Sequence, residues 1–285
     1  PKAVVEFCAP TGSAAKRLAE STNSSAKTIH KLLEFKPYDR ENVTCKNQSN
    51  PIKADFIVVD EMSMVDVELM CMLLDAVQNG TRLLLVGDEN QLPSIGAGNV
   101  FHDIIASGLF PVYRLKENFR QKDAGSLHEN CERILHGKLP KKAADFLIYK
   151  AKDEQDAYNG LCYFMKKYYN PDQPFDMQLI EPSKKGIAGT VNMNLFVHSK
   201  IVHASLPDVG PQPTVGDKVI FTKTSYEDGY VNGDIGIIKS YTAEEIVVWN
   251  GLENLHVPAA AIHDISLAYS YTIHKSQGSE NETVI

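Results

Sequence analysis

Long apolar segments are missing from this chain. None of its apolar runs approaches the roughly 18 residues that a helix needs to cross a bilayer. The first ten residues, PKAVVEFCAP, also lack the apolar core of a secretory signal peptide. We therefore expect no membrane partner and a cytoplasmic location.

Paired cysteines are missing as well. The chain has five cysteines, an odd number, and none of them form a C-x-x-C pair. This spacing gives no indication of a zinc site or a disulfide framework. We interpret the five as reduced thiols, which fits the cytoplasmic expectation. They are Cys8, Cys45, Cys71, Cys131 and Cys162.

An excess of basic residues is absent. The 29 lysines and arginines are outnumbered by 36 acidic residues, which gives a formal net charge of −7. This balance argues against a protein that coats nucleic acid by bulk charge, but it leaves room for a local basic channel. The length of 285 residues suits about two domains.

A phosphate-cradling loop of the pattern G-x-x-x-x-G-K-[ST] is also absent. The only Gly-Lys pair is Gly137-Lys138. Glu132 stands where the first glycine of the pattern belongs, and Leu139 follows the lysine. These 285 residues therefore contain no such loop.

Short apolar runs alternate with helical patterns through most of the chain. Residues 3–7, 55–60 and 81–88 have the composition of buried strands, and helical patterns follow the first two. This alternation predicts a parallel α/β sheet. We expect Gly80 to end the helix after the second strand, a protruding loop or hairpin over 34–54, and a largely helical region over 122–175.

The pattern changes between about residues 210 and 263. Short strand-like runs there are separated by Gly-Asp and Asn-Gly turn signals, which predicts a small β-barrel or sheet. A strand followed by a polar turn returns after residue 264. We therefore interpret residues 210–263 as a β-rich insertion in a second α/β domain.

Two adjacent carboxylates, Asp60 and Glu61, end the apolar run of residues 56–59. One interpretation is a strand that runs out into a solvated loop. The other is a site at the carboxyl end of a parallel strand, where an aspartate holds Mg²⁺ and a glutamate activates water. Ser63 and Asp66 have the spacing of a capping box for the next helix.

The next apolar run also ends in an acid, Asp88, and is followed by Gln91. A glutamine at that end of a strand can contact a γ-phosphate or the water that attacks it. Two neighbouring strands with this ending favour a site over two solvated loops.

Eight segments, in order, resemble the motifs of RecD-type superfamily 1 DNA helicases. They are APTGSAAKRLAE, TIHKLL, VVDEMSMVD, LVGDENQLPSIGAG, LKENFRQ, EPSKKGIAGTVNMN, VNGDIG and YTIHKSQGSE. The resemblance runs from Phe7 to the last residue. It implies two RecA-like parallel-sheet domains, 1–116 and 117–209 with 264–285, and an SH3-like insertion over 210–263.

The resemblance assigns a nucleotide site that binds ATP and Mg²⁺. Asp60 and Glu61 match the pair for Mg²⁺, direct or through water, and for water activation. Gln91 matches a γ-phosphate sensor, and Arg120 matches an arginine that reaches the γ-phosphate. Gly278 and Glu280 match positions near the nucleotide.

The resemblance also assigns contacts with single-stranded DNA to both halves of the chain. The triplet Thr-Ile-His occurs at 28–30 and again at 272–274, which suits a grip on one strand by both halves. The matching residues are Pro10, Thr11, Gly12, Thr28, His30, Pro93, Pro182, Asn194, Thr272, His274, Lys275, Ser276 and Gln277.

The implied function is an ATP-dependent helicase that moves 5′ to 3′ in DNA repair or recombination. Family members carry the phosphate loop upstream and a late arginine motif downstream, so we expect this chain to be an internal piece with little ATP hydrolysis of its own. The alternative is a non-catalytic DNA-binding or scaffold subunit. Either kind of protein could have the subunits of a nuclease-helicase complex as partners.

Overall fold

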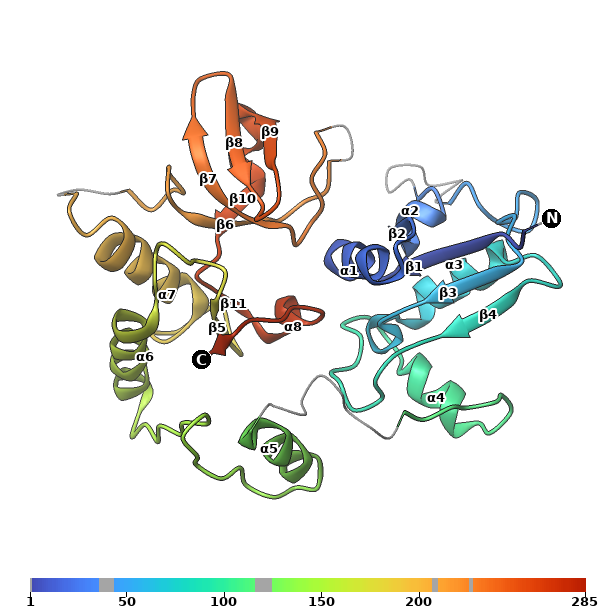
Figure 1. Ribbon diagram of the computed structural model, residues 1–285, viewed down its shortest axis with the longest axis horizontal. Helices are drawn as coiled ribbons and strands as arrows, with labels where there is room; N and C mark the ends of the chain where they lie inside the picture. The colour runs from blue at the N-terminus through green and yellow to red at the C-terminus, as the bar shows by residue number, and fades with distance from the viewer. Residues whose placement is uncertain (1, 36–43, 116–124, 207–209, 226–227) are drawn as a thin grey trace.

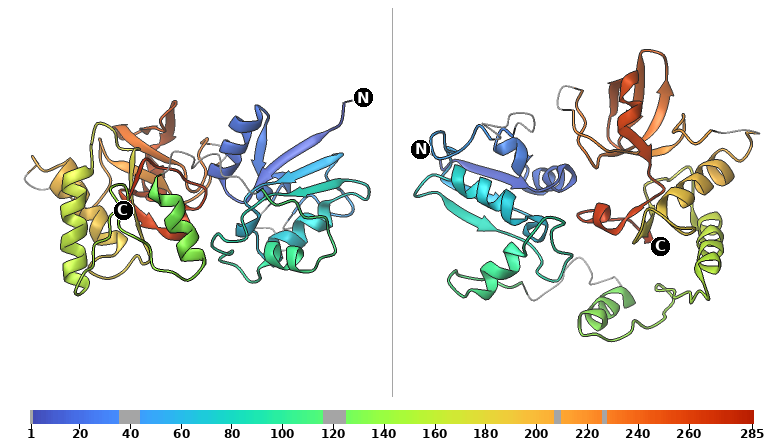
Figure 2. Two further views of the ribbon diagram at one scale, coloured as in Figure 1. Left: turned by 60° about the horizontal axis from the view of Figure 1, so that its bottom comes forward. Right: turned by 180° about the vertical axis from the view of Figure 1, so that it is seen from behind.

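The computed structural model describes residues 2–35, 44–115, 125–206, 210–225 and 228–285, which contain three β-sheets. One parallel sheet with its helices forms one side of the molecule (Figure 1). The second parallel sheet and an antiparallel sheet form the other side, as the views in Figure 2 confirm. Within the described ranges, no helix has the length and apolarity to span a bilayer.

The first sheet has the strand order β2-β1-β3-β4, and all its strands are parallel. This arrangement confirms the predicted parallel α/β architecture for this half. The strands are β1 (Val5–Ala9), β2 (Ala26–Thr28), β3 (Phe56–Val59) and β4 (Arg82–Leu85). The helices are α1 (Gly12–Thr22), α2 (Ile29–Leu32), η1 (Met62–Met64), α3 (Val67–Ala76) and α4 (Val100–Ala106).

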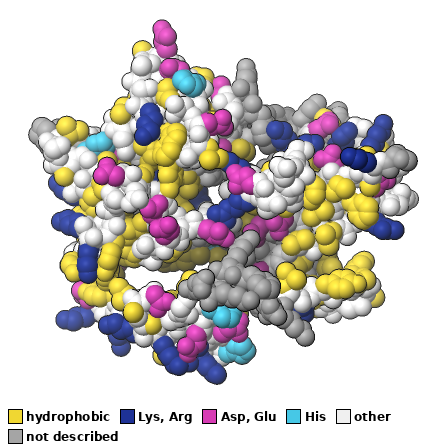
Figure 3. Space-filling model, viewed as in Figure 1, with side chains coloured by type: hydrophobic (Ala, Val, Ile, Leu, Met, Phe, Trp, Pro, Cys, Tyr) yellow, Lys and Arg dark blue, Asp and Glu magenta, His cyan; other side chains and the backbone are white. Residues whose placement is uncertain are grey.

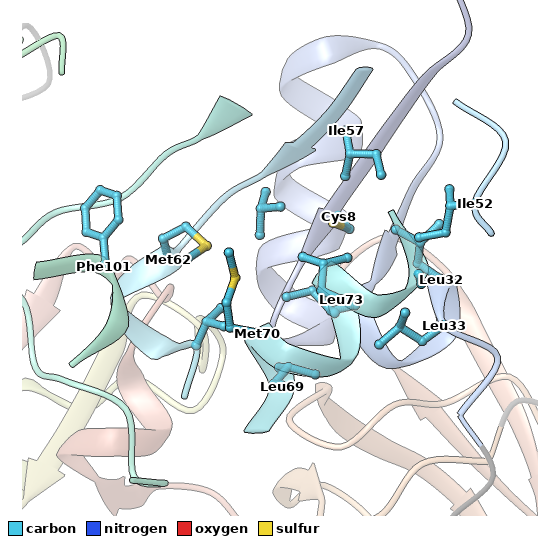
Figure 4. Packing of buried hydrophobic residues seen from close by; sticks show 14 residues of the cluster. Cys8, Leu32, Leu33, Ile52, Ile57, Met62, Leu69, Met70, Leu73 and Phe101 are labelled. Atoms are coloured by element: carbon cyan, nitrogen blue, oxygen red, sulfur yellow. The ribbon is translucent and has the colours of Figure 1, made fainter. Parts of the chain in front are cut away.

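The core of this half lies between β1, β3 and α3. Ile57 and Val59 alternate with outward residues on β3 and are fully buried, as period-2 patterning requires. Leu69 and Leu73, four residues apart, face them from α3 (Figure 4). Ile52 also joins this core, so the end of the 34–54 segment packs inward, whereas residues 36–43 lie outside the described ranges.

Two details around α3 differ from the sequence prediction. The helix is capped by Asp66, whose carboxylate accepts from the Leu69 amide at 2.8 Å, while Ser63 lies four residues before the helix in η1. The helix ends at Ala76 rather than near Gly80, because Val77 turns into an extended bridge with Ile52. The predicted capping box and glycine cap were therefore wrong.

The prediction that β4 is a buried strand was also wrong. It occupies one edge of the sheet, and Leu84 is 55% exposed. The apolar run alone could not distinguish an edge from a centre, because that depends on which strands pair beside it.

The second parallel sheet has the order β11-β5-β12. Its strands are β5 (Met177–Glu181), β11 (Ser270–Thr272) and β12 (Thr283–Val284). The helices of this half are α5 (Ser126–Leu135), α6 (Glu154–Tyr168), α7 (Thr190–Val197), the π-helix η2 (His198–Val202) and α8 (Ile273–Ser276). Residues 136–153 are not helical, so the predicted helical region is shorter than expected.

The antiparallel sheet has the order β10-β6-β7-β8-β9 and its own buried core, which includes Phe221 and Val248. Gly-Asp turns precede β6 and β7, as the turn signals predicted. The elements are β6 (Lys218–Phe221), β7 (Ile235–Tyr241), β8 (Glu245–Trp249), β9 (Asn254–Pro258), η3 (Ala259–Asp264) and β10 (Ile265–Leu267).

Candidate functional site

The predicted site residues of the first half gather at one edge of the first sheet. Because its four strands are parallel, their carboxyl ends all lie at that edge. Residues 10–12 follow β1, residues 28–30 end β2 and begin α2, residues 60–61 follow β3, and residues 88–93 follow β4. The topology therefore brings together positions that are up to 83 residues apart in the sequence.

Glu61 has a backbone conformation that is unusual for a residue with a side chain. Its φ of 54° and ψ of 43° place it in the left-handed region. Such a conformation costs about 1 kcal/mol or more and is found most often at functional sites. The neighbouring Asp60 is half-buried, and its Oδ1 accepts from the Glu61 amide at 2.9 Å. The left-handed backbone at Glu61 thus sets the direction in which the chain continues after β3, and with it the placement of the two carboxylates.

Hydrogen bonds join the end of β3 to the end of β4. The Met62 amide donates to Val86 O at 3.0 Å, and the Val86 amide donates to Val59 O at 2.8 Å. A Cβ at Gly87 would lie 3.0 Å from the Met62 nitrogen, so a glycine is needed for this approach. The loop that carries Gln91 therefore starts directly beside the two acids.

The loop after β4 presents its polar groups to solvent. Asp88 and Gln91 are exposed, and Asp88 Oδ1 accepts from the Asn90 amide at 2.9 Å in a local turn. The Gln91 amide donates to Asp88 O at 3.2 Å, which holds the glutamine at the same turn. Both side chains are free of the core and accessible to a ligand.

A segment of the second half lies against this edge. Gln277 Nε2 donates to Leu92 O at 2.9 Å, and α8 projects toward the first sheet (Figure 1). A Cβ placed on Gly278 would lie 4.0 Å from Glu61 Oε1 and 3.8 Å from the Ala14 side chain. The structure therefore brings Gln277 and Gly278 beside the acidic edge.

Lys184 and Lys275 each stand three residues after the end of a strand, β5 and β11. Partial burial, and then repulsion from Lys184, lower the pKa of Lys275, although part of its side chain stays exposed. A negatively charged ligand would relieve this repulsion. Lys184 was not among the predicted site residues, although its place three residues after the end of β5 was a signal. On the face in Figure 3, basic side chains stand among acidic ones rather than in one stripe.

Several predicted DNA contacts of the first half are already engaged with protein groups, whereas Pro93 is exposed. Thr11 caps α1 by accepting from the Ala14 amide at 3.3 Å, and a Cβ at Gly12 would meet the Val231 side chain at 3.0 Å. Thr28 caps α2 through the Lys31 amide at 3.1 Å. Burial lowers the pKa of His30, whose ring packs edge-on against Phe35.

The predicted residues of the second half have different surroundings. Both amide atoms of Asn194 bond to the backbone of Ser270, at 2.8 and 2.9 Å. Ser276 donates to Ile273 O at 2.6 Å. The exposed predicted positions of this half are Pro182, His274, Lys275 and Glu280. Arg120 lies outside the described residues.

Comparison with known proteins identifies the family. The model of the family described as AAA domain matches residues 2–153. The chain is 30% identical to the ATP-dependent RecD2 DNA helicase of Deinococcus radiodurans over 99% of this chain and 38% of the relative. It is 28% identical to RecBCD enzyme subunit RecD of Mycobacterium tuberculosis over 100% and 55%, respectively. The chain thus spans about half or less of these relatives.

Solved structures support the fold. A Pif1 helicase from Bacteroides, in complex with ADP-AlF3 and single-stranded DNA, superposes with a TM-score of 0.59 at 18% identity. The match covers 100% of this chain and 76% of the other. A structure of two Pif1 helicases at forked DNA gives the same score at 19% identity, over 100% and 75%. The parallel sheets therefore have the RecA-like fold of these structures. The chain belongs to the family described as AAA domain, and RecD-type helicases are among the proteins it resembles.

Proposed function

We propose that this chain forms the core of an ATP-driven motor that moves along single-stranded DNA from 5′ to 3′. The longer protein would act as a DNA helicase in repair or recombination. The main support is the contact between Gln277 and Leu92, because it brings a segment of the second half beside the acidic edge of the first. A motor of this kind needs residues from both halves at one nucleotide.

In this proposal, each predicted nucleotide-site residue has a separate role. Carboxylate oxygens are the ligands that Mg²⁺ prefers, and Asp60 offers one at the strand end, directly or through water. Glu61 orients and deprotonates the attacking water, and Gln91 contacts the γ-phosphate. Arg120 neutralises charge that develops on the transferred phosphoryl group. We propose that Gly278 and Glu280 line the nucleotide.

The DNA lies, in this proposal, across the edge formed by residues 10–12 and 28–30 and the segment 272–277. The Lys184 and Lys275 pair supplies positive charge for a phosphate. Binding is then sequence-tolerant and weakens with salt, because the contacts are to the backbone. We also propose the domain limits given above, with residues 210–263 as an SH3-like insertion beside the strand.

The cellular setting is part of the same proposal. The five thiols are free in the structure, in keeping with a reducing cytoplasm. The relatives named RecBCD enzyme subunit RecD support partners within a nuclease-helicase complex. Because the 285 residues contain no phosphate-cradling pattern, we propose that the chain alone hydrolyses ATP slowly.

Two measurements test the proposal. The first is fluorescence anisotropy of labelled oligo(dT) with the 285-residue chain over a range of salt, where the absence of binding would contradict a DNA-contacting core. The second is unwinding of tailed duplexes by a longer protein that carries this chain and a phosphate-binding loop. Unwinding from 5′ tails supports the motor, whereas DNA binding without DNA-stimulated ATP hydrolysis supports the scaffold alternative.

A further inference from the structure

The carboxylate of Asp217 is buried where the antiparallel sheet meets the second parallel sheet. Asp217 directly precedes β6 and is 0% exposed. Its Oδ1 accepts from the Tyr269 hydroxyl at 2.6 Å, and its Oδ2 accepts from the Thr214 amide at 2.7 Å. The same Oδ1 lies 2.8 Å from His198 Nδ1 and 3.1 Å from His203 Nε2. This cluster has no part in the proposed ATP site.

The π-helix η2 explains how two histidines reach one carboxylate. Residues five apart on an α-helix differ by roughly 140° around its axis and so face different directions. Here the His203 amide donates to His198 O at 2.9 Å, a wider turn that aligns the two positions. The two rings pack edge-on with centroids 4.9 Å apart, and His198 Nε2 lies 2.9 Å from Gly210 O.

Tyr269 connects this cluster to the strand that carries the predicted DNA contacts. It is fully buried and stands immediately before β11. Its hydroxyl donates to Asp217 and also accepts from the Lys218 amide at 3.2 Å. Burial, and then the Asp217 carboxylate, raise the pKa of Tyr269, so the hydroxyl keeps its proton at neutral pH.

The next residue, Ser270, is held by Asn194 of α7 through both its backbone groups, at 2.8 and 2.9 Å. Two successive residues at the start of β11 are thus fixed by buried or half-buried side chains. The strand has only three residues, and within the described part of the chain it pairs only with β5. Its backbone hydrogen bonds therefore specify its register weakly. After Thr272 the chain passes directly into α8.

We propose that Asp217 is a positioning residue for the segment 272–277. By binding the Tyr269 hydroxyl it sets where β11 ends, and hence where Thr272, His274 and Lys275 stand. Asn194 acts beside it on Ser270, as a second anchor of the strand rather than as a contact with DNA. The effect on DNA binding rests on the proposed function, whereas the effect on the strand does not.

Hydrogen exchange tests the structural part without DNA. The Tyr269→Phe variant lacks only the hydroxyl, and we expect the amides of residues 270–277 to exchange roughly ten-fold faster. Asn194→Ala removes the second anchor and should accelerate the same amides. Tyr241→Phe, at an exposed tyrosine of β7, is the matched control and should leave them unchanged. Unchanged exchange in both anchor variants would overturn the proposal.

A double-mutant cycle tests the link to DNA. Tyr269→Phe should weaken oligo(dT) binding roughly five-fold in the wild-type background. In a background with Thr272, His274 and Lys275 replaced by alanine, it should have almost no further effect, because the segment it positions has lost its contacts. An equal loss in both backgrounds would contradict the positioning role. If the wild-type chain does not bind oligo(dT), the proposed function fails, and the exchange result alone decides this inference.

Metal analysis provides a further check. The ligand atoms of His198, His203 and Asp217 lie within 4.8 Å of one another, close enough for a metal ion. We expect no stoichiometric metal in the purified chain after dialysis, because the direct hydrogen bonds occupy these atoms. One zinc per chain, lost in His203→Asn, would overturn the assignment of Asp217 as a hydrogen-bonding anchor.

Discussion

The Glu181→Gln substitution removes a buried ionisable group from the end of β5. Glu181 is 3% exposed, and its Oε1 accepts from the Ser270 hydroxyl at 2.9 Å. Its Oε2 is buried and has no hydrogen-bond partner among the described residues. Glutamine has nearly the same shape and can keep the bond from Ser270, so the variant removes the ionisable proton and puts an amide NH2 group in the place of Oε2.

The raised pKa of Glu181 gives the size of the expected change in the free energy of unfolding. Burial raises this pKa from 4.5 to about 7, although the bond from Ser270 acts in the opposite direction. At 1.36 kcal/mol per pH unit, the difference corresponds to about 3 kcal/mol. The effective dielectric constant around buried groups is higher than that of a dry interior, which reduces this value, so we expect roughly 1–3 kcal/mol.

Proton linkage gives the direction in which the free energy of unfolding changes with pH. Between about pH 4.5 and 7, the folded protein keeps the Glu181 proton and the unfolded chain has lost it. The free energy of unfolding that this residue contributes therefore falls as the pH rises through this range, and is constant above it. The glutamine variant lacks this dependence, so its stability relative to the wild type should rise between pH 4.5 and pH 8 by this amount.

Urea unfolding followed by far-UV circular dichroism at pH 4.5, 6, 7 and 8 measures this difference. Glu244→Gln is the matched control, because Glu244 is exposed and should show no such trend. A Glu181→Gln variant whose stability relative to the wild type falls between pH 4.5 and pH 8 would refute the reasoning, since it would mean that the carboxylate is stabilised in place. A parallel shift at every pH would show that the effect does not come from ionisation.

Three further predictions concern the helix cap and the proposed chemistry. Asp66→Ala removes the bond to the Leu69 amide and should lower the free energy of unfolding by about 1 kcal/mol in the same assay. Glu61→Gln, in a longer protein that supplies the phosphate loop, should abolish ATP turnover but preserve ATP binding; steady-state turnover and filter binding would separate the two. Arg120→Ala in the same protein should reduce kcat about 10³-fold, and a normal kcat would remove this residue from the site.

The sequence alone determined the order of strands and acids along the chain. Runs of apolar residues that stop at Asp60 and Asp88 predicted parallel strands with carboxylates at one edge. This prediction was possible because a short stretch of sequence is enough to indicate a buried strand and the residues at its end. The N-cap of α1 also depends only on neighbouring residues, because the Thr11 hydroxyl accepts from the amide three residues ahead. The eight ordered motifs indicated the family, which the comparisons confirm.

Tertiary structure decided the features that depend on distant neighbours. The exposure of β4 follows from its place at the sheet edge, and the pKa of Glu181 follows from burial that no local pattern shows. The cluster around Asp217 joins positions up to 71 residues apart through a π-helical turn that sequence periodicity did not predict. Local patterns specify which residues can form an element, but pairing, burial and proton affinity are set only when the elements pack together.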